Sequence, residues 1–69
     1  MIKATAEQQQ IALVAFEFLK NGDFQNFDKV LEKQKWELEH FTEITLKAGG
    51  LNCAEQLRVA TLNYLFNAF

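Results

Sequence analysis

The sequence predicts an all-α protein of three helices, and two observations carry this prediction. Proline is absent and glycine occurs only at positions 22, 49 and 50, so the strongest breakers of regular structure divide the chain into three segments. Within each segment apolar residues recur at three- and four-residue spacing, and no stretch shows the period of two that is typical of strands. We therefore expect helices at about residues 5–20, 24–48 and 52–68, within a single small helical domain that spans 1–69.

The first helix is predicted from its two ends and its apolar arc. Thr5 followed by Gln8 fits a capping box, in which each side chain satisfies a backbone N–H that the helix leaves without a partner. Asn21-Gly22 fits a helix stop, because both residues tolerate the left-handed conformation that ends helices. Between these ends, the apolar residues cover a broad arc of a 3.6-residue period: Ile11, Ala12, Val14, Ala15, Phe16, Phe18 and Leu19.

The second helix is expected to be the scaffold of the domain. Asp23 is its expected N-cap. Its core-facing residues repeat at alternating three- and four-residue spacing: Phe24, Phe27, Leu31, Gln34, Leu38, Phe41, Thr45 and Ala48. Polar Gln34 lies in the middle of this seam, where it either sets the register, as buried polar residues do in coiled coils, or lies at a wet edge. An unbroken helix of this length would be about 37 Å long, at about 1.5 Å per residue.

The third helix has two apolar faces, which predicts association. It follows Gly49-Gly50 and begins at a second capping-box pattern, Asn52 with Glu55. One apolar face consists of Leu57, Ala60, Tyr64 and Ala68, and the other of Val59, Leu62, Phe66 and Phe69. The first face can pack on the other two helices, and a symmetry mate is the simplest cover for the second. We therefore expect an intertwined or helix-packed homodimer with Val59, Leu62, Phe66 and Phe69 in the interface. The alternative is a monomer in which this helix lies centrally between the other two.

Chain length and cysteine content also favour oligomerisation. A domain of 69 residues buries only about 60% of the surface that its unfolded chain exposes, so small domains usually need a disulfide, a metal or a partner subunit. The single Cys excludes an internal disulfide, and one His with one Cys does not make a four-ligand zinc site without unusual help from carboxylates. Oligomerisation is therefore the remaining way for so small a domain to gain stability.

Charge and hydropathy exclude two classes of target. The net charge is −2, and seven basic residues are interleaved with nine acidic ones, which disfavours direct sequence-specific binding of nucleic acid. The longest uncharged stretch, 59–69, is far shorter than the ~20 residues of a membrane span. The first ten residues contain no signal-peptide hydrophobic region. We therefore expect a cytoplasmic protein that makes no membrane contact.

The residues that commonly carry catalysis are too few to suggest an enzyme. Serine is absent. Cys53 and His40 are the residue types of a thiolate–imidazole pair, but they lie on different predicted helices, and no third orienting group accompanies them. An unpaired Cys is more often a small buried hydrophobe. We therefore expect a non-enzymatic protein with no catalytic, metal-binding or cofactor-binding residues and no cofactor.

Trp36 is the residue for which we predict a partner-binding role. On an unbroken second helix its angular position lies on the charged side, away from the core seam. An exposed Trp within a polar rim is typical of a binding hot spot, and the rim here would consist of Lys33, Glu37 and His40. The alternative is that a first helix that wraps around this side buries Trp36.

The stretch from Lys29 to Leu38 resembles part of the Hha/YmoA family of small helical transcription modulators. In the second helix of that family, a run of basic-Val-aliphatic-Glu-Lys-amide-Lys-aromatic-Glu-Leu matches Lys29-Val30-Leu31-Glu32-Lys33-Gln34-Lys35-Trp36-Glu37-Leu38, with Tyr in place of Trp36. The resemblance covers about ten residues. The family's first helix is rich in Arg, whereas 11–19 is apolar here, and the family's acidic residue early in the third helix falls near Ala54. The resemblance implies binding to a nucleoid-associated silencer and adjustment of transcription without base readout.

These observations lead to two functional hypotheses that share one mechanism, the docking of a helix face onto a protein. In the first, the chain binds and modulates a regulatory protein, such as a transcription regulator or a nucleoid protein. In the second, it is an inhibitor or anti-activator encoded by a phage or mobile element, which blocks a host transcriptional activator or another host protein. Compact acidic helical proteins of this length are common among such products.

Overall fold

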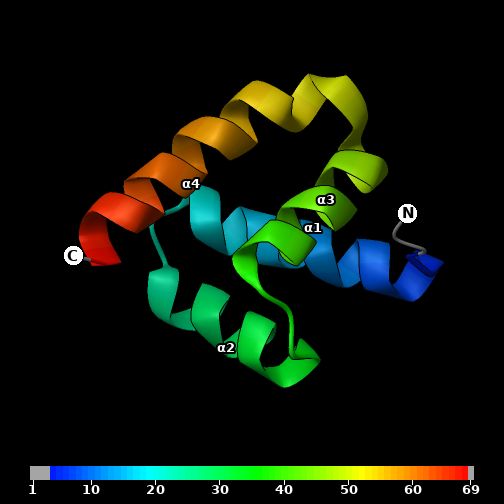
Figure 1. Cartoon of the computed structure of the whole chain (residues 1–69), viewed down its shortest axis with the longest axis horizontal. Coiled ribbons are helices and arrows are strands. Elements are labelled where there is room, and N and C mark those ends of the chain that lie inside the picture. The colour runs from blue at the N-terminus through cyan, green and yellow to red at the C-terminus, as the bar shows by residue number, and fades with distance from the viewer. Residues whose placement is uncertain (1–3, 69) are drawn as a thin grey trace.

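A computed structural model describes residues 4–68, apart from the side chains of residues 50, 51 and 68. The described residues form the α-helices α1 (Ala6–Lys20), α2 (Phe24–Gln34), α3 (Leu38–Gly49) and α4 (Ala54–Ala68), with a 3₁₀ turn, η1 (Gly50–Cys53), before α4. In Figure 1, α4 lies along the top, α2 lies at the bottom, and α1 and α3 lie between them. The all-α prediction is confirmed. The prediction of three helices is wrong, because the second predicted helix is two helices.

The ends of α1 are those that the sequence predicts. The hydroxyl of Thr5 accepts a hydrogen bond from the backbone N–H of Gln8 at 3.1 Å, and the side-chain oxygen of Gln8 accepts one from the Thr5 N–H at 3.0 Å. At the other end Gly22 has a φ of 76°, and the N–H of Asp23 donates to the carbonyl of Phe18 at 2.9 Å. This bond closes the helix in the manner of a Schellman motif.

The second predicted helix breaks at Lys35. Asp23 caps α2 as expected, with its carboxylate accepting from the N–H of Asn26 at 3.4 Å. Lys35 then adopts the left-handed conformation, with a φ of 59°, and the N–H of Trp36 donates to the carbonyl of Leu31 at 2.9 Å. The chain turns there and continues as α3. An unbroken helix of about 37 Å would exceed the 31 Å longest extent of the molecule.

The turn at Lys35 carries Trp36 into the protein core. The Trp36 side chain is only 9% exposed and belongs to the same buried cluster as Phe16, Phe27 and Phe41. On a straight helix this residue would lie on the charged side. Full burial of a large apolar side chain is worth roughly 1.5–3 kcal/mol, which offsets the cost of one residue in the left-handed region, about 1–2 kcal/mol.

The connection between α3 and α4 depends on the lack of a side chain at Gly49. A Cβ atom at this position would lie 2.5 Å from the Sγ atom of Cys53, so only glycine allows so close an approach. The thiol of Cys53 donates to the carbonyl oxygen of Thr45 at 3.8 Å. The helix predicted at 52–68 therefore starts two residues later, at Ala54, after the 3₁₀ turn.

The core lies around α1, which packs against α2, α3 and α4. Two alanines of α1, Ala12 and Ala15, are fully buried and let the other helices approach closely. An aromatic cluster joins the remaining helices, because the ring of Phe27 lies 4.9 Å from that of Phe41 and 5.1 Å from that of Tyr64, both edge-to-face. The radius of gyration, 11.0 Å, equals the roughly 11 Å expected of a compact 69-residue domain.

Candidate functional site: an apolar surface on α3 and α4

The predicted partner-binding site around Trp36 does not have the expected form. Trp36 is buried, so the expectation that it is an exposed anchor is wrong, and the reason is the break in the helix at Lys35. The rings of Trp36 and His40 stack at 6.1 Å with an interplanar angle of 22°, and His40 is half-buried. Lys33 and Glu37 are exposed, as expected of rim residues, but they surround no exposed aromatic side chain.

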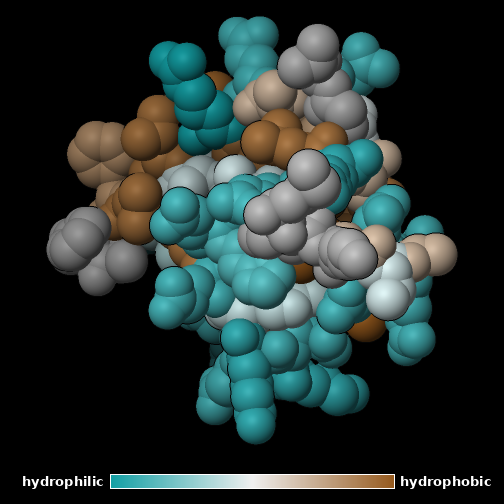
Figure 2. Space-filling model, turned by 45° about the vertical axis from the view of Figure 1, so that its right-hand side comes forward, coloured by the Kyte–Doolittle hydropathy of each residue, from teal (hydrophilic) through white to brown (hydrophobic). Residues whose placement is uncertain are grey.

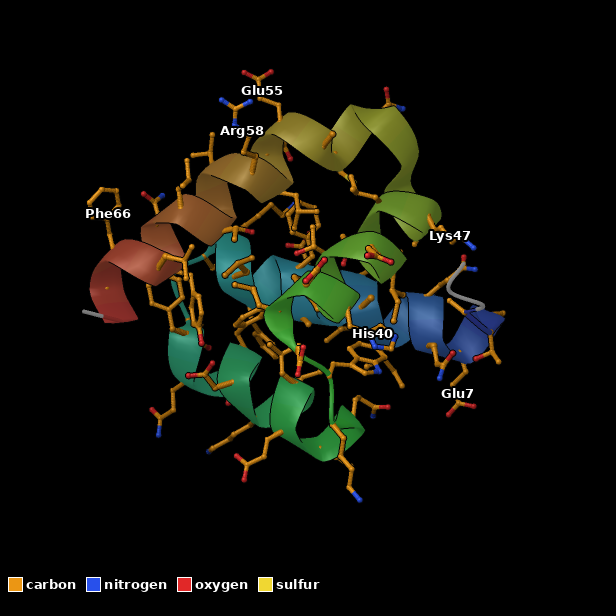
Figure 3. All side chains as sticks on the ribbon, in the orientation of Figure 1. Glu7, His40, Lys47, Glu55, Arg58 and Phe66 are labelled. Carbon is orange, nitrogen blue, oxygen red and sulfur yellow. The ribbon has the colours of Figure 1, made fainter. Side chains whose placement is uncertain are left out.

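The residues predicted for the dimer interface lie on the outer face of α4. Val59 is 52% exposed, Leu62 49% and Phe66 79%, whereas Leu57 and Ala60 on the inner face are buried. The fourth predicted interface residue, Phe69, lies outside the described residues. Figure 3 shows Phe66 pointing away from the body of the protein, as do Glu55 and Arg58 farther along the same helix. We define the outer face of α4 as Glu55, Arg58, Val59, Leu62 and Phe66.

A shallow depression lies on this outer face. It has a volume of about 470 Å³ and is lined by Ala54, Glu55, Arg58, Val59 and Leu62, so one helix alone provides its floor and rim. Phe66, the most exposed of the large apolar side chains described, lies one helical turn beyond Leu62. The outer face thus carries a hollow in its N-terminal half and a protruding aromatic ring near its C-terminal end.

A second hollow, the α3/α4 groove, lies between those two helices. Its volume is about 360 Å³, most of its lining surface is apolar, and the lining includes the buried residue Leu57. Leu46 of α3 is 37% exposed and Leu62 of α4 is shared with the depression on the outer face, so the two apolar surfaces are continuous. The full lining is Thr42, Leu46, Ala54, Leu57, Arg58, Thr61 and Leu62.

One polar atom in the groove lining is left without a partner. The Oγ1 atom of Thr61 is buried and makes no hydrogen bond, whereas the hydroxyl of Thr42 donates to the carbonyl of Leu38 at 2.8 Å. A buried hydroxyl without a partner costs about 1–3 kcal/mol. Sequence reasoning identified the outer face from its spacing but missed the groove, because Leu46 lies off the core seam and its position beside α4 is set only by the tertiary fold.

The surface is apolar on one side of the molecule and polar on the other. Figure 2 shows hydrophobic side chains gathered toward the upper left, at the level of α4, while the lower part, where α2 lies, is almost entirely hydrophilic. Among described residues, the large hydrophobic side chains that stay exposed are mostly on α3 and α4: Leu46, Val59, Leu62, Leu65 and Phe66, with Val14 on α1. This asymmetry makes the α3 and α4 side the candidate contact surface.

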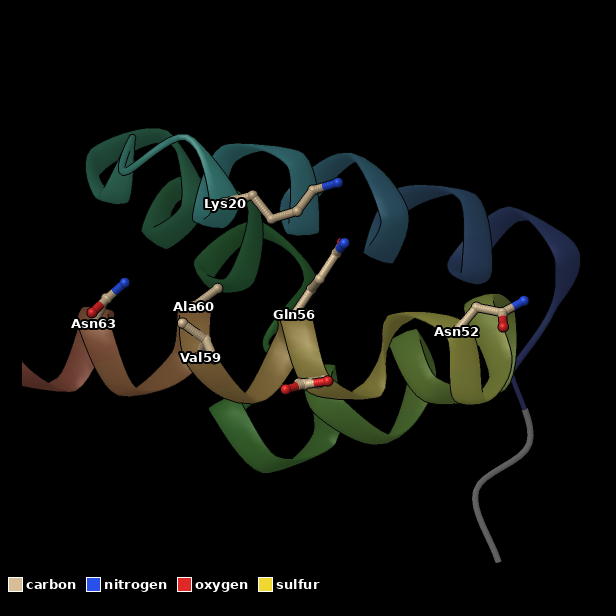
Figure 4. Close-up of a pocket in the computed structure, with 7 residues that line it drawn as sticks. Lys20, Asn52, Gln56, Val59, Ala60 and Asn63 are labelled. Carbon is tan, nitrogen blue, oxygen red and sulfur yellow. The ribbon is translucent and has the colours of Figure 1, made fainter.

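The hollow between α1 and α4 is of a different kind. Figure 4 shows Lys20 of α1 facing Gln56 and Asn63 of α4 across a space of about 510 Å³. The ammonium group of Lys20 lies 2.9 Å from the carboxylate of Glu17 and 4.7 Å from the centre of the Phe16 ring. Its charge is therefore already engaged within α1, and the remaining polar lining consists mainly of amides.

Tyr64 joins α4 to α2 through one strong hydrogen bond. Its hydroxyl donates to Oδ1 of Asp28 at 2.6 Å. This hydrogen bond, then partial burial, then the negative charge of Asp28 raise the pKa of Tyr64 from 10.0 to about 12. The contact fixes the C-terminal half of α4 on α2 and so helps to hold Leu62 and Phe66 outward.

Within 4–68 no group of three or more His, Cys, Asp or Glu side chains is placed to hold a metal ion. None of the helices in that range is both long and apolar enough to cross a bilayer. The fold and the surface together define a small all-helical protein with one exposed apolar side. No protein-family model matches the chain, and no curated protein or solved structure shows significant similarity to it.

Proposed function

We propose that this chain is a non-enzymatic protein-binding module, which pairs as a homodimer through the outer face of α4 and modulates a transcription regulator that docks in the α3/α4 groove. The observation that carries the proposal is the continuous apolar surface from Leu46 across Leu62 to Phe66. Its five exposed large side chains present on the order of 400–500 Å² of apolar surface, a patch size that is often functional in soluble proteins.

The shape of the groove favours a helix as the docked element. The groove lies between two helices, and its lining offers aliphatic side chains along more than two turns of α4, from Ala54 to Leu62. An amphipathic helix presents apolar side chains at three- and four-residue spacing, which suits such a groove. The polar residues of the lining are Thr42, Arg58 and Thr61, and within the described residues the hydroxyl of Thr61 makes no hydrogen bond.

The class of partner rests on the resemblance of 29–38 to the Hha/YmoA family, which implies a nucleoid-associated or other transcription regulator. That stretch covers the end of α2, the left-handed turn and the first residue of α3, so it is not one helix here. The net charge of −2 supports a protein partner over direct contact with nucleic acid. The chain would then act on DNA-bound regulators without reading bases itself.

The test compares two single substitutions to glutamate in capture experiments from a cell lysate, followed by assays with purified protein. Leu46→Glu places a charge at the groove, and Gln25→Glu places the same charge on the exposed polar side of α2. We expect the wild type and Gln25→Glu to capture the same regulator, and Leu46→Glu to bind it at least about tenfold more weakly. The purified regulator should also bind its DNA differently when the chain is added.

Two outcomes would contradict this proposal. One is capture that Leu46→Glu does not reduce, and the other is a captured regulator whose DNA binding the chain leaves unchanged. If instead the chain abolishes the DNA binding of a single activator and captures no nucleoid protein, the second hypothesis, a phage-type anti-activator, is favoured.

A further inference from the structure

The outer face of α4 carries an apolar protrusion and a partly apolar hollow at different levels of one helix. The depression is centred near position 58, since its lining residues are Ala54, Glu55, Arg58, Val59 and Leu62. Phe66 protrudes two turns farther along, with 79% of its side chain exposed. A side chain of one helix that enters a hole formed by four side chains of another is the knobs-into-holes contact of packed helices.

The positions of Phe66 and of the depression along α4 decide whether two copies pair with parallel or antiparallel helices. A two-fold pairing brings the same patch of each copy together. If the two α4 helices ran parallel, the Phe66 rings would oppose each other and the two depressions would face each other empty. If the helices are antiparallel, each Phe66 meets the depression of the other copy, so the face is self-complementary only in this orientation.

We propose that the occupant of the depression is Phe66 of a second copy, and that the two α4 helices of the homodimer lie antiparallel with the two-fold axis at Leu62. This inference rests on the homodimer proposed above and adds its register. The pairing fixes the position of the two-fold axis. If Phe66 of one copy enters the depression centred near position 58 of the other, the axis passes midway between these two levels, at position 62. Leu62 is 49% exposed and would contact its own equivalent there.

Charge complementarity supports the antiparallel orientation. In this register Arg58 lies opposite Phe66 of the second copy, within the last turn of a helix that ends at Ala68. The C-terminal end of a helix carries partial negative charge, and that end of α4 has no basic residue of its own in its last turn. A guanidinium group over an aromatic ring adds a cation–π contact.

The available area also suits a second copy. A stable pair usually buries about 800 Å² on each partner, of which about 65% is apolar in homodimers. The exposed large apolar side chains of α4 alone, Val59, Leu62, Leu65 and Phe66, supply most of that apolar share. The fit therefore needs no partner larger than the chain itself.

The register is tested by disulfide cross-linking of single cysteine variants, made in a Cys53→Ala background so that no native thiol reacts. In the antiparallel register, residue 62 meets its own equivalent, whereas the two copies of residue 55 lie about 21 Å apart along the helix axis, at about 1.5 Å per residue. Disulfides require Cα atoms within about 7 Å. We expect oxidised Leu62→Cys to form a covalent dimer and Glu55→Cys, on the same exposed face, to stay uncrosslinked.

Covalent dimers from both variants would show a parallel arrangement and overturn the inference. A non-covalent dimer that forms no cross-link at 62 would overturn the register and leave the homodimer standing. A wild type that stays monomeric would defeat both the register and the homodimer, while regulator capture through Leu46 would be unaffected. Far-ultraviolet circular dichroism of each reduced variant verifies that it is folded.

A second measurement does not depend on cysteine chemistry. Phe66→Glu would place a carboxylate in each depression and should weaken self-association at least about a hundredfold. Gln25→Glu adds the same charge on the exposed polar side of α2, away from α4, and should leave the dimer dissociation constant within about threefold. An equal effect of the two substitutions would contradict the seating of Phe66.

Discussion

Replacing Trp36 by alanine should remove a large part of the stability of the fold. Trp36 is 9% exposed and lies within the main core, so its truncation is expected to cost about 3–5 kcal/mol. A domain of this length has a total stability of roughly 3.5–10 kcal/mol, taking about 0.05–0.15 kcal/mol per residue. Trp36→Ala should therefore be close to unfolding at room temperature, whereas Glu37→Ala, at the exposed neighbour, should stay within about 0.5 kcal/mol of the wild type.

The assay is urea unfolding followed by far-ultraviolet circular dichroism, together with fluorescence quenching by acrylamide. The chain contains a single Trp, so its fluorescence reports on this site alone. We expect the quencher to reach Trp36 in the folded protein far less readily than in urea. If Trp36→Ala loses less than about 1 kcal/mol, or if quenching is equal in the folded and unfolded states, the burial of Trp36 and the helix break that accompanies it are refuted.

Three further predictions concern the helix connections. The single Tyr should titrate by ultraviolet absorbance near pH 12, and Asp28→Asn should return the Tyr64 pKa toward 10. The folded chain holds the Tyr64 proton more tightly than the unfolded chain does. The contribution of this hydrogen bond to the free energy of unfolding is therefore present below pH 10 and is lost as the pH rises toward 12. Lys35→Gly should raise the thermal midpoint, because glycine adopts the left-handed conformation without steric strain, and the expected gain in stability is about 0.5–1 kcal/mol. Gly22→Ala, at a φ of 76°, should lower the stability by about 1 kcal/mol. Cys53→Ala should retain the helical spectrum and partner binding, because the thiol occupies a packing position; lost binding with an intact fold would contradict this.

Local signals in the sequence predicted most of the helix ends. The capping box at Thr5 and Gln8, the stop at Gly22 and the cap at Asp23 are all present in the structure, because each depends on residues within four positions of one another. The break at Lys35 was not predictable in this way. Neither glycine nor proline marks it, and its cause is a long-range one, the burial of Trp36 against residues of other helices.

The same division between local and long-range causes applies to the candidate site. The outer face of α4 follows from spacing alone, so its outward direction could be predicted at Val59, Leu62 and Phe66. The α3/α4 groove could not, since Leu46 becomes a neighbour of Leu62 only when η1 folds α4 back beside α3. The partner-binding prediction at Trp36 relied on an unbroken helix and lost its basis when the helix proved to be broken.

Sedimentation equilibrium of the wild type and Phe66→Glu over micromolar concentrations tests most directly whether the exposed apolar face of α4 is a contact surface. The wild type should sediment with twice the mass of the chain, and Phe66→Glu should sediment as a folded monomer, because the substitution removes an exposed aromatic side chain without touching the core. A wild type that stays a folded monomer throughout this range would contradict pairing through α4.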